Sequence, residues 1–203
     1  MPEAKRDPRR RGAATRERAQ QVALRLFTEQ GYEATSLRQI ADELGINKAS
    51  LYYHFDGKEA ILQSVLDQRG DEAEGLLDWA RRQPPSPGLL REAVSRWVDS
   101  FTTDKLQGIR FLAANPNLLS GFHGRVAPPR VGVGLSELAE HLIDLLPTPS
   151  AADSVMLRMA LLSINAAVQA SAGTGVPDEA VVAAARRTAD VITASLTAPA
   201  ATV

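Results

Sequence analysis

The sequence contains no cysteine, only 3 histidines and few aromatic residues, which make up 5% of the chain. Without cysteine it can form neither disulfide bonds nor thiolate metal sites, and this composition fits a reducing compartment. The histidines form no H-E-x-x-H motif, and the sequence has no G-x-S-x-G motif and no P-loop. We therefore expect a protein that is not an enzyme and that holds no metal ion and no cofactor.

Long apolar runs are absent as well. The longest apolar region, residues 155–172, is interrupted by Arg158, Asn165 and Gln169, which favours a buried helix over a membrane span. The basic N-terminal segment is not followed by the apolar stretch that a secretory signal requires. We therefore expect a cytoplasmic protein without a membrane segment.

The 203 residues are sufficient for one or two domains with a substantial core, since 44% of them are hydrophobic. The formal net charge of -1 hides an asymmetry, because residues 1–58 are net positive and the rest of the chain is net negative. Several arginines stand near the start of the chain: Arg9, Arg10, Arg11, Arg16 and Arg18. Local basic patches attract phosphate groups even in a protein of nearly neutral charge.

Nearly every periodic segment has the spacing of an amphipathic helix, and no segment has the alternation of a convincing strand. We expect an all-α protein whose later helices cover residues 58–82, 89–103, 104–114, 135–146, 151–172 and 178–196. Residues 83–88 contain three prolines and residues 120–134 are rich in Gly and Pro, so we expect loops in both places.

The N-terminal region shows three helical patterns. The first has an apolar face made by Ala19, Val22, Ala23, Leu26 and Phe27. The second, residues 37–44, has Thr35 or Ser36 to begin it, Gln39 in the capping-box position and Gly45 to end it. Asn47 is a favourable N-cap for a short third helix.

Two helices joined by a short turn that contains glycine form a helix-turn-helix, whose second helix can enter the major groove of DNA. Leu44, Leu51 and Phe55 would join the helices in a three-helix core. The other side chains of the short helix carry donors, acceptors and aromatic edges suited to bases and phosphates: Lys48, Ala49, Ser50, Tyr52, Tyr53 and His54. The spacing alone also allows a helical hairpin with a solvated face.

Residues 31–62 closely resemble the N-terminal DNA-binding domain of the TetR family of bacterial transcriptional regulators. The resemblance rests on Gly31-Tyr32, Thr35-Ser36, Ile40-Ala41, Leu44-Gly45-Ile46, residues 48–55 and Lys58-Glu59. It implies a homodimeric repressor that binds a palindromic operator in double-stranded DNA and is released by a small-molecule effector. It also implies that the helical body binds the effector and forms the dimer.

Residue roles follow from the resemblance, position by position. Ser36 and Arg38 would contact phosphates; Lys48, Ala49, Ser50 and Tyr52 would face the bases; Tyr53 and His54 would hold phosphates or sugars. Lys58, with the amide groups that open the following helix, would anchor a further phosphate. We expect a helix-turn-helix domain over residues 15–60 and a body over residues 61–203.

Residues 1–14 are basic, and we expect a disordered arm there. Arg9, Arg10 and Arg11 could reach into a minor groove. The same residues could equally form a tail that only keeps the protein soluble.

The body offers side chains for an apolar or amphipathic effector between its helices. The candidates are Trp97, Phe101, Phe111, Phe122, Met156, Met159 and Asn165. Aromatic and Met residues at helical spacing are also typical of an ordinary core, and Asn165 could instead face a partner helix.

The last helical pattern contains a stripe of small and apolar residues that needs a partner: Val181, Ala185, Ala189, Ile192 and Leu196. The resemblance implies that this stripe forms the dimer interface, although it could also be buried within one subunit. A rival hypothesis is a DNA-bound structural or assembly protein whose body recruits protein partners and binds no small molecule.

Overall fold

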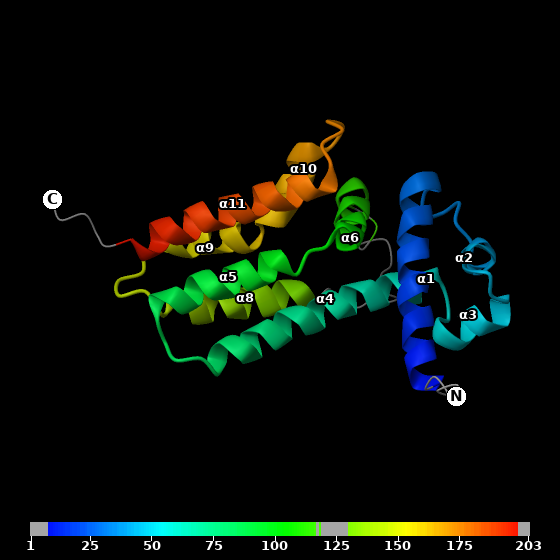
Figure 1. Cartoon of the computed structure of the whole chain (residues 1–203), viewed down its shortest axis with the longest axis horizontal. Helices are drawn as coiled ribbons and strands as arrows, with labels where there is room; N and C mark the ends of the chain where they lie inside the picture. Colours follow the sequence, from blue (N-terminus) through cyan, green and yellow to red (C-terminus); the bar gives the residue numbers. More distant parts are fainter. Residues whose placement is uncertain (1–7, 117, 119–129, 199–203) are drawn as a thin grey trace, which may run out of the picture. The chain divides into compact units, whose positions relative to one another are not determined.

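The structure, a computed structural model, describes residues 8–116, 118 and 130–198 (Figure 1). The regular structure of these residues is entirely helical, which confirms the expected all-α class. They form two compact units, of which the first holds residues 8–65 and the second residues 66–113 and 130–198. The few described residues that follow Ala113 belong to the first unit.

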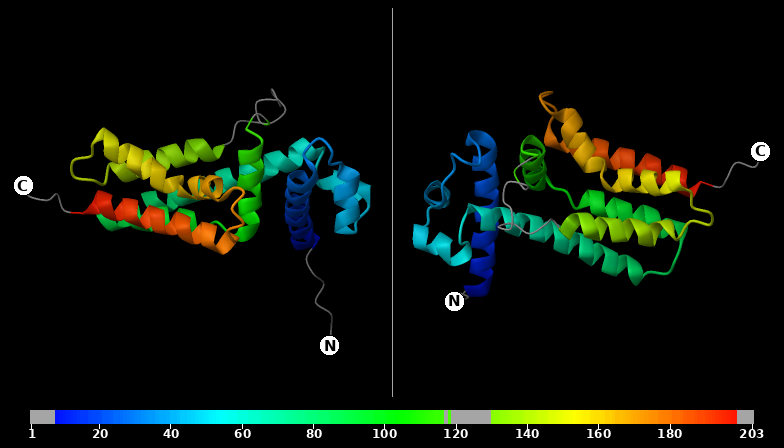
Figure 2. Two further views of the ribbon diagram at one scale, coloured as in Figure 1. Left: turned by 90° about the horizontal axis from the view of Figure 1, so that it is seen from above. Right: turned by 180° about the vertical axis from the view of Figure 1, so that it is seen from behind.

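The first unit is built from α1 (Pro8–Gln30), α2 (Leu37–Leu44), α3 (Lys48–His54) and the beginning of α4 (Lys58–Arg81). The two short helices pack against α1 and against each other (Figures 1 and 2). Their core consists of buried side chains, among them Ala23, Phe27, Ile40, Leu51 and Phe55. A buried hydrogen bond of 2.8 Å from Gln20 Nε2 of α1 to Ser64 Oγ of α4 links the two longer helices within this unit.

The second unit contains the rest of α4 and the helices that follow. These are α5 (Pro87–Asp99), α6 (Thr103–Ala114), α8 (Arg130–Ile143), α9 (Ala151–Leu161), α10 (Ser163–Ser171) and α11 (Asp178–Thr197). Helix α11 packs along α5, α9 and α10, and α8 packs on α9 (Figures 1 and 2). The resulting core is formed largely by leucine, valine and alanine side chains from α4, α5, α8, α9, α10 and α11.

The N-terminal arm differs from expectation where the structure describes it. Residues 1–7 lie outside the described residues, but residues 8–14 form the first part of α1 rather than a disordered arm. Proline is tolerated in the first turn of a helix, and the arginines and alanines that follow Pro8 have high helix propensity. The first unit also reaches Val65, beyond the expected end at residue 60.

Helix α8 begins at Arg130, within the segment 120–134 for which the sequence predicts a loop. A Cβ added at Gly134 would lie 3.1 Å from the Cβ of Ala73 on α4. The glycine therefore serves a close approach of α8 to α4 rather than a turn. The sequence pattern alone does not distinguish these two uses of glycine.

The expected single helix over residues 151–172 is divided into α9 and α10, which meet at a bend of 59°. Leu162, at the junction, has φ -93° and ψ 6° and lies outside the helical region. At the same place, Trp97 Nε1 of α5 donates a buried hydrogen bond of 3.0 Å to the carbonyl oxygen of Leu161. The indole thus satisfies the carbonyl group that ends α9.

Within the described residues, no single helix has the length and apolar character needed to cross a membrane. Only α9 and α10 taken together reach that length and composition, and they are separated by the 59° bend.

Candidate functional site

The turn between α2 and α3 is fixed by the caps of the two helices. The hydroxyl group of Ser36 accepts a hydrogen bond of 3.2 Å from the amide of Gln39, while the Gln39 side chain accepts one of 2.8 Å from the amide of Ser36. This capping box begins α2 as predicted. Gly45 ends the helix at φ 67°, a left-handed conformation that glycine adopts without strain.

Helix α3 also begins as predicted, because Asn47 Oδ1 accepts a hydrogen bond of 2.7 Å from the amide of Ser50. The side chain of Leu51 is fully buried and that of Phe55 is almost so, which fixes the rotation of α3 about its axis. The helix therefore presents its opposite face to solvent as a rigid surface.

That outward face carries the residues that the sequence indicated. Lys48, Ala49 and Ser50 are exposed, and residues Tyr52 and Tyr53 are 44% and 87% exposed. The ammonium group of Lys48 lies 5.2 Å from the ring centre of Tyr52, which places a cation over an aromatic face. Exposed tyrosines beside a cation suit an interface that meets both apolar and charged groups.

The other residues of this unit that are predicted to contact DNA differ in exposure and in the interactions that their side chains already make. Arg38 has 82% of its side chain exposed, and its one ion pair with a described residue is long, 3.8 Å to Asp42. The hydroxyl of Ser36 is exposed but engaged in the cap described above. His54 is half-buried, and its ring lies edge-on to that of Tyr53 at 5.3 Å. Arg38 is thus the cation of this group that is best placed to reach a phosphate.

Unlike the side chain of Arg38, the side chain of Lys58 is engaged in contacts within the protein. Its ammonium group donates to the carbonyl oxygens of Tyr32, Thr35 and Glu33 at 2.6, 3.3 and 3.4 Å, and it lies 4.3 Å from the ring centre of Tyr32. The lysine therefore clamps the segment between α1 and α2, a role that the sequence did not indicate. Burial, followed by the charge of Glu59, raises the pKa of Tyr32 above its ordinary value, so this phenol stays neutral beside the lysine.

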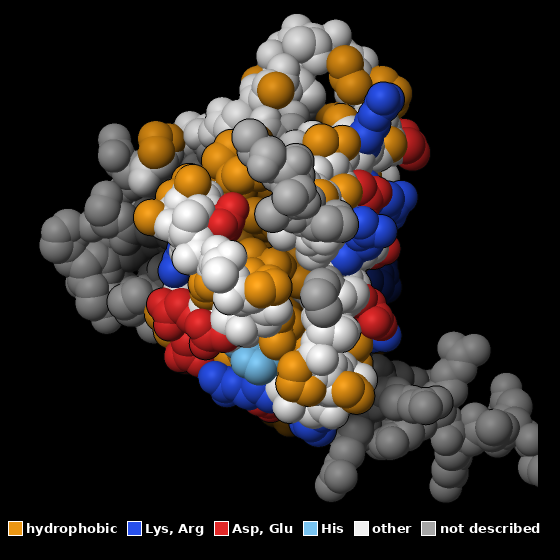
Figure 3. Space-filling view, turned by 90° about the vertical axis from the view of Figure 1, so that its left-hand side faces the viewer, with side chains coloured by type: hydrophobic (Ala, Val, Ile, Leu, Met, Phe, Trp, Pro, Cys, Tyr) orange, Lys and Arg blue, Asp and Glu red, His pale blue; other side chains and the backbone are white. Residues whose placement is uncertain are grey.

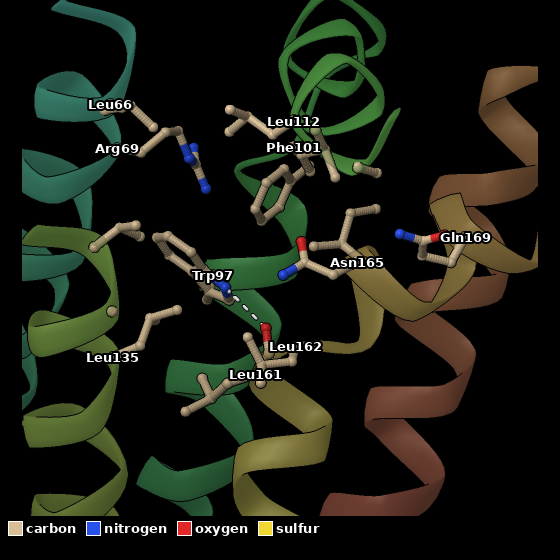
Figure 4. Close-up of a pocket in the computed structure, with 15 residues that line it drawn as sticks. Leu66, Arg69, Trp97, Phe101, Leu112, Leu135, Leu161, Leu162, Asn165 and Gln169 are labelled. Atoms are coloured by element: carbon tan, nitrogen blue, oxygen red, sulfur yellow. Dashed lines mark hydrogen bonds between the residues drawn. The ribbon is translucent and has the colours of Figure 1, made fainter. Parts of the chain in front are cut away.

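The second unit contains a cavity of about 390 Å³. Its walls come from α4, α5, α6, α8, α9 and α10, and the loop residue Phe101 adds to them. Most of the lining residues are apolar: Leu66, Trp97, Phe101, Ile109, Leu112, Ala113, Val131, Leu135, Leu161, Leu162 and Ile164. Gly132, Arg69, Asn165 and Gln169 complete the lining (Figure 4). The volume lies within the range of small-molecule sites.

The structure brings only some of the predicted ligand residues together. Trp97, Phe101 and Asn165 line the cavity. Phe111 is fully buried outside the lining, and Met156 and Met159 also lie outside it, the side chain of Met159 being 56% exposed. Phe122 lies outside the described residues. The helical repeat places Met156 and Met159 on a different face of α9 from the buried Leu157 and Leu161.

Arg69 is a cavity residue that the sequence reasoning missed. Its guanidinium carbon lies 4.0 Å from the ring centre of Phe101 and 4.4 Å from that of Trp97. It pairs with Glu72 and makes long contacts of 3.4 and 3.5 Å with Ser100 Oγ. Burial lowers the pKa of Arg69, and the neighbouring Glu72 carboxylate opposes this shift. One sequence signal was present: Arg69 falls on the apolar face of α4 between Leu66 and Ala73.

The stripe on α11 that the resemblance assigns to a dimer interface is instead buried within the single chain. Val181, Ala185 and Ala189 are 2%, 1% and 2% exposed within this single chain, and Ile192 and Leu196 pack partly buried against the same core. The stripe is therefore used within the subunit, as close packing of α11 on α5, α9 and α10 requires. Large apolar side chains remain exposed elsewhere on these helices, namely Val155 and Met159 of α9 and Val191 of α11.

Figure 3 shows the face of the second unit where α11 ends and α9 begins. Hydrophobic side chains occupy much of the middle of this face, and charged side chains lie mostly along its two sides.

In the described part of the chain, no group of three or more His, Asp or Glu side chains is arranged to hold a metal ion.

Comparison with known proteins adds to this geometry. Residues 21–65 match the family described as bacterial regulatory proteins, tetR family. The chain is 30% identical over 118 residues to the HTH-type transcriptional repressor BepR of Brucella suis biovar 1 (strain 1330), covering 57% of this chain and 56% of BepR. It is 39% identical over 82 residues to the HTH-type transcriptional repressor KstR2 of Rhodococcus jostii (strain RHA1), covering 40% of this chain and 34% of KstR2.

The matched region thus spans about half the length of BepR and a third of KstR2. Solved structures extend the similarity of fold to nearly the whole chain. AmtR of Mycobacterium smegmatis has a TM-score of 0.56 at 24% identity, covering 96% of this chain and 97% of its own. A transcriptional regulator of the TetR family from Agrobacterium tumefaciens has a TM-score of 0.57 at 19% identity, covering 92% and 100%.

Proposed function

We propose that this chain, which belongs to the tetR family of bacterial regulatory proteins, is a homodimeric transcriptional repressor released from DNA by a small molecule. The observation that carries the DNA-binding part is the outward face of α3, on which Lys48, Tyr52 and Tyr53 are exposed while Leu51 is fully buried. A short rigid helix with this division of side chains suits the major groove.

The surroundings of α3 support a contact with a DNA phosphate beside the groove. Arg38 stands near the start of α2 with a nearly free guanidinium group, and charged contacts to phosphate position the reading helix. The caps at Ser36 and Asn47 hold α2 and α3 without using the side chains of the outward face of α3. We assign base contacts to Lys48, Ala49, Ser50 and Tyr52, and phosphate or sugar contacts to Arg38, Tyr53 and His54.

A homodimer follows from the size of such a reading helix, because α3 has only 7 residues and a single half-site offers little specificity. Two copies related by a two-fold axis read a palindromic operator whose half-sites lie about one helical turn, roughly 34 Å, apart. Helices α9 and α11 pack against each other within the chain. We propose that the apolar side chains that these two helices leave exposed form the dimer contact. Exposed large apolar side chains favour association.

The contacts made by α4 support the proposal that a small molecule controls DNA binding. At its beginning Lys58 clamps the segment that precedes α2, and further along Leu66 and Arg69 line the cavity. A ligand that shifts the preferred position of Leu66 and Arg69 acts on the helix that also carries Lys58. Coupling between the two sites of this kind commonly amounts to about 1–3 kcal/mol, or roughly 5- to 150-fold in affinity.

Selection of duplexes from a random DNA pool with the purified full-length chain tests the DNA-binding part. We expect enrichment of a palindrome, whose affinity falls as salt rises. A Tyr52→Ala, Tyr53→Ala double variant should lose the enrichment while keeping its helix content. Enrichment of no sequence by the parent chain would contradict the proposal, and enrichment of an unpaired half-site would contradict the dimeric part.

A further inference from the structure

We propose that the cavity of the second unit takes an amphipathic monocarboxylate, whose carboxylate binds Arg69 and whose apolar body lies against the surrounding side chains. The inference rests on the proposed function only in that a small molecule occupies this cavity, and it adds the chemical class of that molecule. It is carried by the position, the partners and the charge balance of Arg69.

Arg69 is the single charged residue among those that line the cavity in the described part of the chain. Figure 4 shows its guanidinium group reaching from α4 toward Phe101 and Trp97, with apolar side chains around them. A charge in such surroundings interacts strongly with an opposite charge, because water screens it little. No carboxylate of a described residue lines the cavity to attract a cationic ligand in the same way.

The guanidinium group retains donors for a ligand. Its plane carries five N–H donors, but among the described residues it has only one close acceptor, the Glu72 carboxylate, and the two long contacts with Ser100 Oγ. The ring faces of Trp97 and Phe101 hold the group in place without accepting those hydrogens along the guanidinium plane. A carboxylate matches the fork of an arginine and accepts two parallel hydrogen bonds.

The charge balance around Arg69 favours one additional negative charge. Glu72 accepts from Arg69 and also pairs with Lys105 at 2.9 Å. In the described part of the chain these two cations share the Glu72 carboxylate, so this group of three side chains carries an excess of one positive charge. A monocarboxylate would balance it, a doubly charged phosphate would exceed it, and an ammonium ligand would meet repulsion from both cations.

The other polar groups of the cavity fit the uncharged part of the same molecule. The side-chain amide of Asn165 is turned toward Trp97 and the interior of the cavity (Figure 4), and an amide both donates and accepts hydrogen bonds. The indole N–H of Trp97 is already bonded to Leu161, so it is not available to the ligand. The volume of about 390 Å³ suits a compact ligand with one ring or a short chain.

Three probes with one apolar body and different head groups test the assignment: 4-butylbenzoate, 4-butylbenzyl alcohol and 4-butylbenzylamine. Binding to the full-length chain is measured by titration calorimetry at pH 7.5 and fixed salt. We expect the carboxylate to bind at least about tenfold more tightly than the alcohol, which is the low end for charge-assisted hydrogen bonds. The amine should bind most weakly of the three.

Variants locate the binding without relying on the packed Arg69. Asn165→Asp places a negative charge at an exposed position of the cavity lining, so it should weaken the binding of 4-butylbenzoate by roughly fivefold or more relative to the binding of the alcohol. Asn165→Lys should increase the affinity for 4-butylbenzoate. The matched control is Ala170→Asp, which adds the same charge to an exposed residue of α10 outside the lining and should change neither affinity.

Arg69→Gln should abolish the preference for the carboxylate over the alcohol, provided that its circular dichroism spectrum matches that of the parent. Equal binding of carboxylate and alcohol by the parent, tighter binding of the amine, or no binding of the carboxylate at millimolar concentration would each overturn the proposal. The DNA selection described above is scored on the ligand-free chain. Its failure would remove the repressor function but not the carboxylate preference, so the two results remain separable.

Discussion

The ammonium nitrogen of Lys58 lies 2.6 Å from the carbonyl oxygen of Tyr32 and 4.3 Å from the centre of the ring of the same residue. One side chain at the beginning of α4 thus holds the backbone and the aromatic ring of the segment that leads from α1 to α2. The Lys58 side chain is only 18% exposed. The orientation of the helix-turn-helix therefore depends on an internal contact of α4 as well as on its own core.

Replacement of this lysine should affect the stability of the first unit. Lys58→Met keeps the aliphatic stem on Tyr32 but leaves three carbonyl groups without their cation. We expect the free energy of unfolding to fall by about 1.5–3 kcal/mol, the usual contribution of hydrogen bonds to a charged group. Urea unfolding followed by circular dichroism measures the change.

The matched control is Lys48→Met on the exposed face of α3, which should change the stability by no more than about 0.5 kcal/mol. Equal stability of the Lys58→Met variant and the parent would show that the internal contacts of Lys58 contribute nothing in solution.

Arg38 should contribute to DNA binding through charge alone. Its side chain is 82% exposed and its ion pair with Asp42 is long, at 3.8 Å, so Arg38→Ala should leave the stability nearly unchanged. We expect the dependence of log K on log salt to lose about 0.9 per phosphate contact, or roughly 2 for a dimer. Fluorescence anisotropy with the selected operator at several salt concentrations gives this slope.

Asp42→Ala is the companion variant, because it removes the carboxylate that competes for the same guanidinium group. It should leave the slope unchanged or make it steeper. A loss of slope in Asp42→Ala equal to that in Arg38→Ala would mean that the pair acts on the fold and not on DNA.

The local signals of the first unit could be predicted from the sequence because they depend on neighbours along the chain. Ser36 with Gln39, Gly45 and Asn47 define the ends of two helices through hydrogen bonds that span three residues or through one backbone conformation. The inward positions of Leu51 and Phe55 follow from the helical repeat. The role of Lys58 could not be predicted, because its acceptors lie more than twenty residues away in the sequence.

The second unit was less predictable for the same reason. The residues of α9 and α10 form one continuous helical pattern, and the bend coincides with the bond from Trp97, which is 64 positions from Leu161. The stripe that includes Ala185 correctly indicated a buried face of α11, but periodicity does not tell whether the covering helix belongs to the same chain. The role of Arg69 could not be predicted, because a single charge on an apolar face gives no information about the rings that surround it.

Trp97 should hold the bend between α9 and α10. Trp97→Phe keeps an aromatic ring but leaves the buried carbonyl of Leu161 without its donor, and an unsatisfied buried acceptor costs about 1–3 kcal/mol. We expect a lower melting temperature of the chain and a weaker affinity for cavity ligands, both measurable by a thermal shift assay with and without 4-butylbenzoate.

The other tryptophan of the chain, Trp79, provides the control. It is half-buried and stacks under the guanidinium group of Arg96 at 4.0 Å. Trp79→Phe retains an aromatic face for that contact, so its effect on the melting temperature should be clearly smaller than that of Trp97→Phe. The opposite order would show that the bond to Leu161 does not hold the bend.

In the proposed dimer, substitution by arginine at two positions of α11 should have different effects. Residue Val191 is 64% exposed and Ala185 is 1% exposed. Val191→Arg should therefore leave the subunit folded and, at micromolar concentration, convert a dimer into a monomer in light scattering, because it places charges in a self-complementary apolar contact. Ala185→Arg should instead reduce the free energy of unfolding, since the added side chain has no space in the subunit core. A parent chain that is monomeric would remove the dimer from the proposal, and a Val191→Arg variant that stays dimeric would move the contact away from α11.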